Sequence, residues 1–157
     1  MTTIRQFTCE DFFRFNFVEL CDQPRALCFH SLGGYLEYMS KYPDYYLVAE
    51  SPSRDFMGYI MGTDTKSGEN HGPSSCVCLL VCAQSYRSIG VATQLMRVFE
   101  WISKRKRCDY IDLHVQLSNC IALSLYEKLG FTVHENLYDY YWVLADPRAY
   151  LMRKYLL

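Results

Sequence analysis

The residues with the clearest chemical pattern stand where an apolar run meets an amphipathic stretch. Residues 76–82 are almost all apolar, which predicts a buried strand. Arg87, Gly90 and Ala92 follow in the pattern R-x-x-G-x-A and open a stretch of helical periodicity. The first N–H groups of a helix lack intrahelical partners, and its dipole attracts anions there. With a glycine for close approach and an arginine for charge, the junction fits a diphosphate, although the pattern alone also fits an ordinary loop-to-helix entry.

Other chemistries fit the sequence less well. The junction lacks the G-K-S/T of a phosphate-binding P-loop and has only one glycine of the dinucleotide fingerprint. Cys76, Cys78 and Cys82 should share one face of their strand, but their spacing does not suit zinc, so no metal site is expected. A cysteine nucleophile assisted by His114 stays open in principle. Most of the eight cysteines are expected to be small buried hydrophobes.

The elements that must position the junction follow from hydrophobic periodicity and from turn residues. Strands are predicted over residues 4–7, 45–49, 56–61, 76–82, 110–115, 131–133 and 138–144. Helices are predicted from a Thr8 cap, over residues 35–42, from Gly90, and from a Ser118 cap to a stop at Gly130, the last with Ile121, Leu125 and Leu129 on its apolar face. This order predicts a mixed α/β sheet with helices on both faces.

Composition limits the class of protein. A chain of 157 residues, half of them apolar, suits one packed domain. The formal net charge of −1 argues against a nucleic-acid binder. Neither a membrane-spanning apolar stretch nor the apolar core of a signal peptide is found, so an intracellular protein that does not bind membranes is expected.

The junction and a second motif together resemble the GNAT acetyltransferase superfamily. In that family, R/Q-x-x-G-x-G/A cradles the pyrophosphate of CoA, and N-x-x-A-x-x-x-Y-x-x-x-G-F marks the next helix. The second motif is matched by Asn119, Ala122, Tyr126, Gly130 and Phe131. The resemblance implies one GNAT-like domain over residues 1–157, with a mixed, mostly antiparallel sheet, a splayed parallel strand pair and helices on both faces.

Longer segments resemble the catalytic subunits of NatB-type N-terminal acetyltransferases. These segments are residues 1–11, 13–16, 48–50, 57–62 and 140–141. The resemblance implies acetyl transfer from acetyl-CoA to the α-amine of nascent or short peptides that begin with Met followed by Asp, Glu, Asn or Gln. It also implies a cytoplasmic enzyme whose early helices bind a larger, helical, ribosome-associated auxiliary subunit.

The same resemblance implies roles for individual residues. Tyr126 is expected to protonate the departing CoA thiolate. The cofactor is expected at Leu80, Cys82, Arg87, Ser88, Gly90, Val91, Ala92 and Asn119, and the peptide at Cys76, Cys78, Tyr140 and Tyr141. Structural alternatives stay open: Tyr126 as a half-buried helix aromatic, Asn119 as a helix-start residue, and the two tyrosines in simple packing.

The chain also departs from the family pattern. Ser88 and Gln116 each replace an expected arginine, and Cys76 and Cys78 replace a histidine and a threonine beside the substrate amine. Residues 25–34 contain no acidic residue, and of the aromatic residues expected to grip the peptide they contain only Phe29. Two alternatives therefore stay open: a diverged paralogue that binds CoA or the auxiliary subunit with little or no activity, and a small-amine acetyltransferase.

The first helix is expected to carry more apolar positions than one core-facing stripe can bury. These positions are Phe12, Phe13, Phe15 and Phe17. Apolar area left exposed often marks an interface, so the first two helices are expected to bind the partner.

Overall fold

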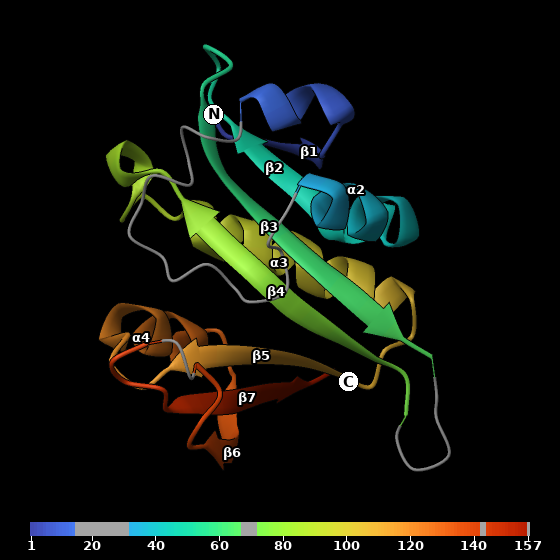
Figure 1. Ribbon diagram of the computed structural model, residues 1–157. Helices are drawn as coiled ribbons and strands as arrows, with labels where there is room; N and C mark the ends of the chain where they lie inside the picture. The colour runs from blue at the N-terminus through green and yellow to red at the C-terminus, as the bar shows by residue number, and fades with distance from the viewer. Residues whose placement is uncertain (15–31, 67–71, 142–143, 157) are drawn as a thin grey trace. The chain divides into compact units, whose positions relative to one another are not determined.

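The computed structural model describes residues 1–14, 32–66, 72–141 and 144–156 (Figure 1). Its elements are β1 (Thr3–Gln6), η1 (Cys9–Phe13), α2 (Leu32–Lys41), η2 (Pro43–Tyr45), β2 (Tyr46–Glu50), β3 (Phe56–Thr65), β4 (Ser74–Cys82), η3 (Gln84–Tyr86), α3 (Val91–Arg105), β5 (Tyr110–Gln116), α4 (Cys120–Lys128), β6 (Thr132–Leu137) and β7 (Ala149–Tyr155), where η marks a short 3-10 turn. Hydrogen bonds join the strands in the order β1-β2-β3-β4-β5-β7-β6. β4 and β5 are parallel, whereas β1–β2, β2–β3, β5–β7 and β6–β7 are antiparallel. The predicted mixed, mostly antiparallel α/β sheet is confirmed.

The chain divides into two compact units, each described by itself. The first contains Met1–Thr63 and Cys78–Ile102, and the second contains Asp64–Val77 and Ser103–Leu157. The boundary falls within β4, so the strand contributes its end to the first unit and its beginning to the second. In the part of the chain that the structure describes, no helix is long and apolar enough to cross a membrane.

The first unit packs helices against both faces of its strands. The Tyr45 ring lies 4.8 Å, between centroids, from the ring of Phe99 on α3. Tyr45 ends η2 and Tyr46 begins β2, and the Tyr46 phenol interacts electrostatically with Tyr35 and Tyr38 of α2, the helix that covers the other face of these strands (Figure 1). β2 is buried at all five positions, and Leu95 and Phe99 of α3 are fully buried, as the helical period predicts.

A charged cluster joins β1, η1 and β2 in this unit. The guanidinium of Arg5 donates to both carboxylate oxygens of Asp11, at 2.7 and 2.8 Å, and to both of Glu50, at 2.8 and 3.0 Å. Arg14 adds a contact of 2.6 Å to Glu50. Asp11 also accepts the backbone N–H of Thr8 at 2.7 Å, so the predicted helix start is confirmed, as a 3-10 turn through Phe13.

The second unit holds β5, β7 and β6 around the end of α4. Gly130 adopts a φ of +89°, which favours glycine, and donates its N–H to Glu127 O at 3.0 Å. The Phe131 N–H donates to Tyr126 O at 3.0 Å, and the two rings pack edge to face at 5.9 Å. These contacts form a Schellman motif, so the predicted stop of this helix at Gly130 is confirmed.

Three boundary predictions need correction. The strand predicted over residues 138–144 is wrong for its described part, because the Leu144 N–H donates to Tyr141 O at 2.8 Å in a turn; the strand lies further on, as β7. The helix predicted from residue 35 begins at Leu32. The cap of α4 is Asn119 rather than Ser118, which shifts the helix by one residue.

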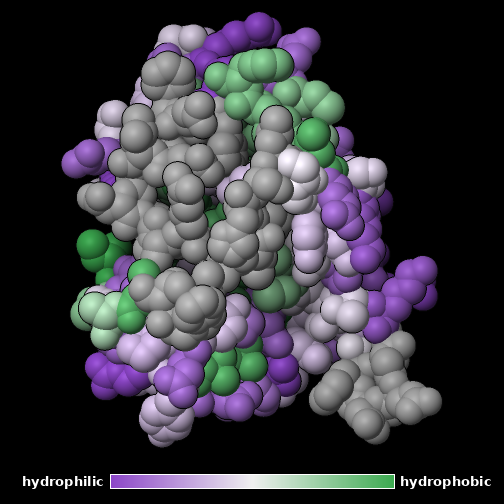
Figure 2. Space-filling model, in the orientation of Figure 1, coloured by the Kyte–Doolittle hydropathy of each residue, from purple (hydrophilic) through white to green (hydrophobic). Residues whose placement is uncertain are grey.

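Predicted burial is also corrected at several positions. Ile121, placed on the apolar face of α4, is 87% exposed. Among the described cysteines only Cys108 is buried, while Cys9 and Cys120 are exposed and Cys76, Cys78 and Cys82 are intermediate. Phe13 is 87% exposed, in line with the apolar surplus predicted for the first helix, whereas Phe15 and Phe17 lie outside the described residues. Figure 2 shows hydrophobic surface residues scattered among hydrophilic ones.

Candidate functional site

The junction after β4 belongs to the first unit and has an unusual backbone. β4 ends at Cys82, η3 follows, and α3 begins at Val91. Ser88 and Gly90 adopt positive φ values of 65° and 89°. A Cβ added to Gly90 would meet no atom within 4 Å, so backbone conformation rather than crowding requires glycine there.

This backbone leaves donors free for an anion. Among the described residues, the N–H groups of Ile89, Gly90, Val91 and Ala92 have no backbone hydrogen-bond partner, and the ladder of α3 starts with Gln94 N–H to Gly90 O at 3.0 Å. The four residues from Arg87 to Gly90 are exposed. The Arg87 side chain makes one long contact, Nε to Cys82 O at 3.4 Å. The donor set, the open space over Gly90 and the arginine fit a diphosphate group.

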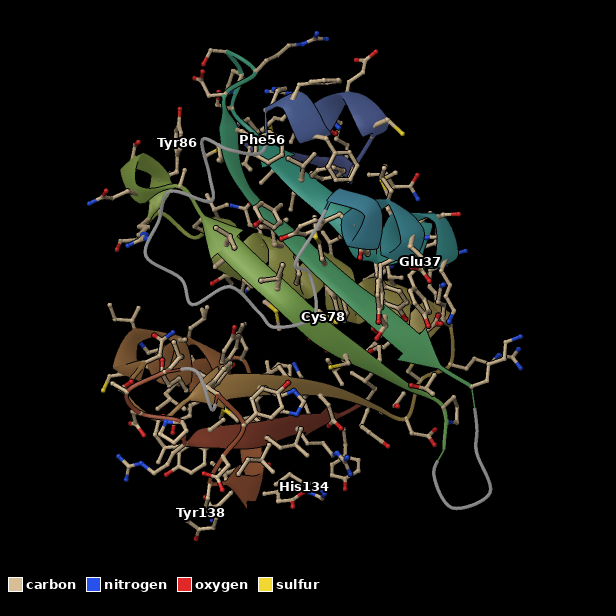
Figure 3. The ribbon with its side chains drawn as sticks, viewed as in Figure 1. Glu37, Phe56, Cys78, Tyr86, His134 and Tyr138 are labelled. Atoms are coloured by element: carbon tan, nitrogen blue, oxygen red, sulfur yellow. The ribbon has the colours of Figure 1, made fainter. Side chains whose placement is uncertain are left out.

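The cysteines predicted to share one face of β4 are all partly exposed. Cys76, Cys78, Leu80 and Cys82 are half-buried, as is Leu79 between them, whereas Ser75, Val77 and Val81 are buried, so the shared face stays a prediction. Figure 3 labels Cys78 on this strand. The contacts predicted for these side chains with cofactor or peptide stay predictions.

The second unit holds Tyr126 and Asn119 on α4. Tyr126 is 8% exposed, and its backbone oxygen and ring are fixed by the Schellman motif. The Asn119 side chain accepts the Ala122 N–H at 3.1 Å, so it caps the helix. The helix-start reading of Asn119 is therefore correct. Its proposed contact with CoA would use the remaining amide N–H groups.

Tyr140 and Tyr141 lie in the turn before β7, beside His114, which the sequence suggested only as the partner of a cysteine nucleophile. The His114 ring on β5 stacks on Tyr140 at 4.3 Å with an interplanar angle of 6°, and Tyr140 contacts Tyr141 edge to face at 4.8 Å. Burial lowers the pKa of His114, and the carboxylates of Asp112 and Glu135 oppose that shift. The sequence feature that could have identified His114 is the alternation of side chains along β5, which places His114 on the half-buried face of this strand.

The comparisons with known proteins agree with this geometry. Residues 4–131 match the family model described as "Acetyltransferase (GNAT) family". The chain belongs to the GNAT acetyltransferase family. The matched range contains the whole junction, Asn119, Tyr126 and Phe131, so the GNAT resemblance predicted from the two motifs is confirmed.

Within the GNAT family, the relatives are N-terminal acetyltransferases. The NatB catalytic subunit NAA20 of Arabidopsis thaliana is 38% identical over 90% of this chain and 79% of its own length. Naa20 of Chaetomium thermophilum, solved with a bisubstrate analogue, is 29% identical with a TM-score of 0.87 over 98% of this chain and 86% of its own. A NatB complex bound to CoA and MES contains a chain 27% identical, with a TM-score of 0.84 over 99% of both chains. The chain is therefore an N-terminal acetyltransferase homologue of the NatB catalytic-subunit type, as predicted.

Proposed function

We propose that this protein transfers the acetyl group of acetyl-CoA to the α-amino group of protein N-termini that begin with Met followed by Asp, Glu, Asn or Gln. Residues 1–157 form one catalytic domain for this reaction. The observation that carries the proposal is the junction between β4 and α3, with its free N–H groups and positive φ at Ser88 and Gly90, in a chain 38% identical to a NatB catalytic subunit.

The co-substrate is held by backbone groups more than by side chains. The N–H groups from Ile89 to Ala92 and the cation of Arg87 bind the diphosphate of acetyl-CoA. Leu80 and Cys82 offer backbone groups to the pantetheine arm, as an added strand would. Acetyl-CoA supplies the activated thioester, and these residues bind and orient it.

The chemistry suits an α-amine. An α-amino group has a pKa near ~8, so about a tenth is neutral at pH 7, whereas a lysine amine near ~10.4 is under about a thousandth neutral. The neutral amine attacks the thioester carbon, and the C–S bond then breaks while the thiolate gains a proton or a hydrogen bond from Tyr126. His114, whose lowered pKa keeps the imidazole neutral near pH 7, accepts the proton that the amine loses.

The peptide and the partner use other surfaces. Cys76 and Cys78 bind the peptide from half-buried positions of β4, and Tyr140 and Tyr141 bind it from the turn before β7. A larger helical auxiliary subunit binds beside the exposed ring of Phe13, and the assembly works in the cytoplasm.

Initial rates with acetyl-CoA on a panel of substrates test the proposal. The panel contains peptides beginning Met-Asp, Met-Glu, Met-Asn and Met-Gln, peptides with other N-termini, an N-terminally blocked peptide with an internal lysine, and a polyamine. The four Met peptides are expected to react fastest. Faster reaction of the lysine or the polyamine would contradict the proposal, as would binding of acetyl-CoA in calorimetry without turnover of any peptide, which is the result expected of a non-catalytic paralogue.

A further inference from the structure

The Tyr46 hydroxyl is the one buried side-chain nitrogen or oxygen, among the residues that the structure describes, without a hydrogen-bond partner. Tyr46 is the first residue of β2 and is 0% exposed. A buried polar group without a partner destabilises a fold, and a phenylalanine would fill the same space without that cost. An oxygen kept under these conditions points to a ligand.

The orientation of Tyr46 shows which surface that oxygen serves. Its neighbour Tyr45, at the end of η2, packs on Phe99 of α3, whereas the Tyr46 phenol interacts electrostatically with Tyr35 and Tyr38 of α2. Burial raises the pKa of Tyr46, and the groups of Cys78, Tyr38, Tyr35 and Tyr42 raise it further. The phenol therefore keeps its proton at neutral pH and lies among Cys78 of β4 and the tyrosines of α2 and its end.

Cys78 connects this buried oxygen with the face of β4 assigned to the peptide. Its side chain is half-buried, like those of Cys76 and Leu80, so this part of β4 is partly exposed to solvent. The Cys78 thiol interacts electrostatically with the Tyr46 phenol, so the phenol lies beside this half-buried part of β4.

We infer that the Tyr46 hydroxyl is a substrate-binding group that donates a hydrogen bond to the backbone carbonyl oxygen of the first residue of the peptide, beside Cys78. The attacking amine must keep its lone pair for the thioester, whereas the adjacent carbonyl is an acceptor in every peptide. The contact therefore contributes to affinity without selecting the second residue. This inference rests on the proposed function and deepens it.

The test is the variant Tyr46→Phe, which removes the oxygen and keeps the ring. Loss of one neutral hydrogen bond should raise the peptide KM about three- to tenfold, by the same factor for Met-Asp and Met-Asn peptides. The kcat and the KM for acetyl-CoA should stay within about twofold, and the melting temperature should stay equal or rise because a buried unpartnered oxygen is gone. The matched control is Tyr45→Phe, on a ring that is equally buried but packs on Phe99 of α3, which should leave the peptide KM unchanged.

The outcomes separate this inference from the proposed function. Turnover of the peptides by the unaltered protein tests the proposed function alone. If no peptide is turned over, calorimetry replaces the kinetic measurement. The peptide dissociation constant of Tyr46→Phe is then compared with that of the unaltered protein. An unchanged peptide KM or dissociation constant in Tyr46→Phe would overturn the inference, and so would a lower melting temperature with equal weakening of both substrates, because that pattern marks a structural role.

Discussion

At the residue scale, the proposed acid Tyr126 is held from two sides. Its backbone oxygen accepts the Phe131 N–H at 3.0 Å, and its ring packs against Phe131. The turn at Gly130 forms both contacts, since it brings the chain back onto the end of α4. These contacts involve the backbone and the ring, so the hydroxyl can be removed without disturbing them.

We therefore expect Tyr126→Phe to lower kcat at least tenfold with little change in acetyl-CoA binding, because a positioned general acid contributes about 10²–10⁴-fold. The measurement is kcat under conditions where chemistry limits the rate, with the dissociation constant from calorimetry. Tyr155→Phe, on the 63% exposed Tyr155 of β7, is the control and should keep the original rate. A wild-type kcat in Tyr126→Phe would mean that Tyr126 is structural.

His114 permits a second prediction at this scale, on stability against pH. Burial lowers the pKa of His114 in the folded protein below its ordinary value near ~6.5, so the unfolded chain binds more protons as the pH falls through that value. The stability linked to His114 is present above the unfolded pKa and is lost on acidification toward the folded pKa. We expect the free energy of unfolding, from denaturant titrations between pH 7.5 and 5, to fall less steeply in His114→Phe.

The control for this titration is His134→Gln on β6, where the side chain is exposed. That variant should keep the slope of the unaltered protein. Equal slopes for His114→Phe and the unaltered protein would contradict the assignment of a buried, neutral imidazole stacked on Tyr140.

At the element scale, the charged cluster fixes the first elements of the chain on β2. Hydrogen bonds from Arg5 and then Arg14 lower the pKa of Glu50 to about 2 from 4.5, against the opposing effect of burial. The Glu50 side chain is 12% exposed, so solvent screens these pairs little. A single carboxylate thereby connects β1, β2 and the residue that follows η1.

We expect Glu50→Gln to reduce the free energy of unfolding at pH 7 by about 1–3 kcal/mol, because it leaves the partly exposed guanidinium groups of Arg5 and Arg14 without the charge of their largely buried partner. A lowered carboxylate pKa gives stability that is present above the unfolded value of 4.5 and is lost as the pH falls toward 2, so the difference between variant and parent should shrink over that range. Denaturant titrations at pH 7 and pH 3 measure both effects.

The control is Asp146→Asn, which breaks an exposed pair with Arg148 and should change the free energy of unfolding little. An equal loss of stability in both variants would contradict a special role for the charged cluster.

At the scale of the whole molecule, the question is which exposed apolar residue meets a partner. Phe13 and Ile121 are both 87% exposed, but only Phe13 lies in the segment proposed to bind the auxiliary subunit. Buried aromatic anchors often dominate interface energy.

We therefore expect Phe13→Ser to reduce co-purification with a co-expressed NatB auxiliary subunit at least tenfold, and Ile121→Ser to leave it unchanged. Circular dichroism would check that both variants fold. Equal retention of the partner by the two variants would show that Phe13 lies outside the interface. A chain that is monomeric, soluble and fully active alone would contradict partner dependence altogether.

The sequence by itself determined the family, the reaction class and the backbone of the junction. The reason is that the strand, turn and helix carrying Arg87, Gly90 and Ala92 are contiguous, so their residue types and spacing reflect a local backbone whose donors fit an anion. The end of α4 at Gly130 could be predicted for the same reason, because the hydrogen bonds that form it join residues 126–131. The turn after β6 was not predictable in this way, because apolar residues 138–144 read as a strand until the hydrogen bonds of Tyr141 to Pro147 and Leu144 are seen.

Only the tertiary structure decided which distant residues meet. Three pairs of residues join segments that are far apart in the chain: His114 with Tyr140, Glu50 with Arg5, and Tyr46 with Cys78. Such pairs have no regular spacing in the sequence, so hydrophobic periodicity cannot predict them. Burial on a helix face could not be decided from the sequence for the same reason. Ile121 has the period of a core residue, yet none of the described elements covers its side chain, which is 87% exposed. A buried oxygen such as that of Tyr46 is visible only when every possible partner around it is in place.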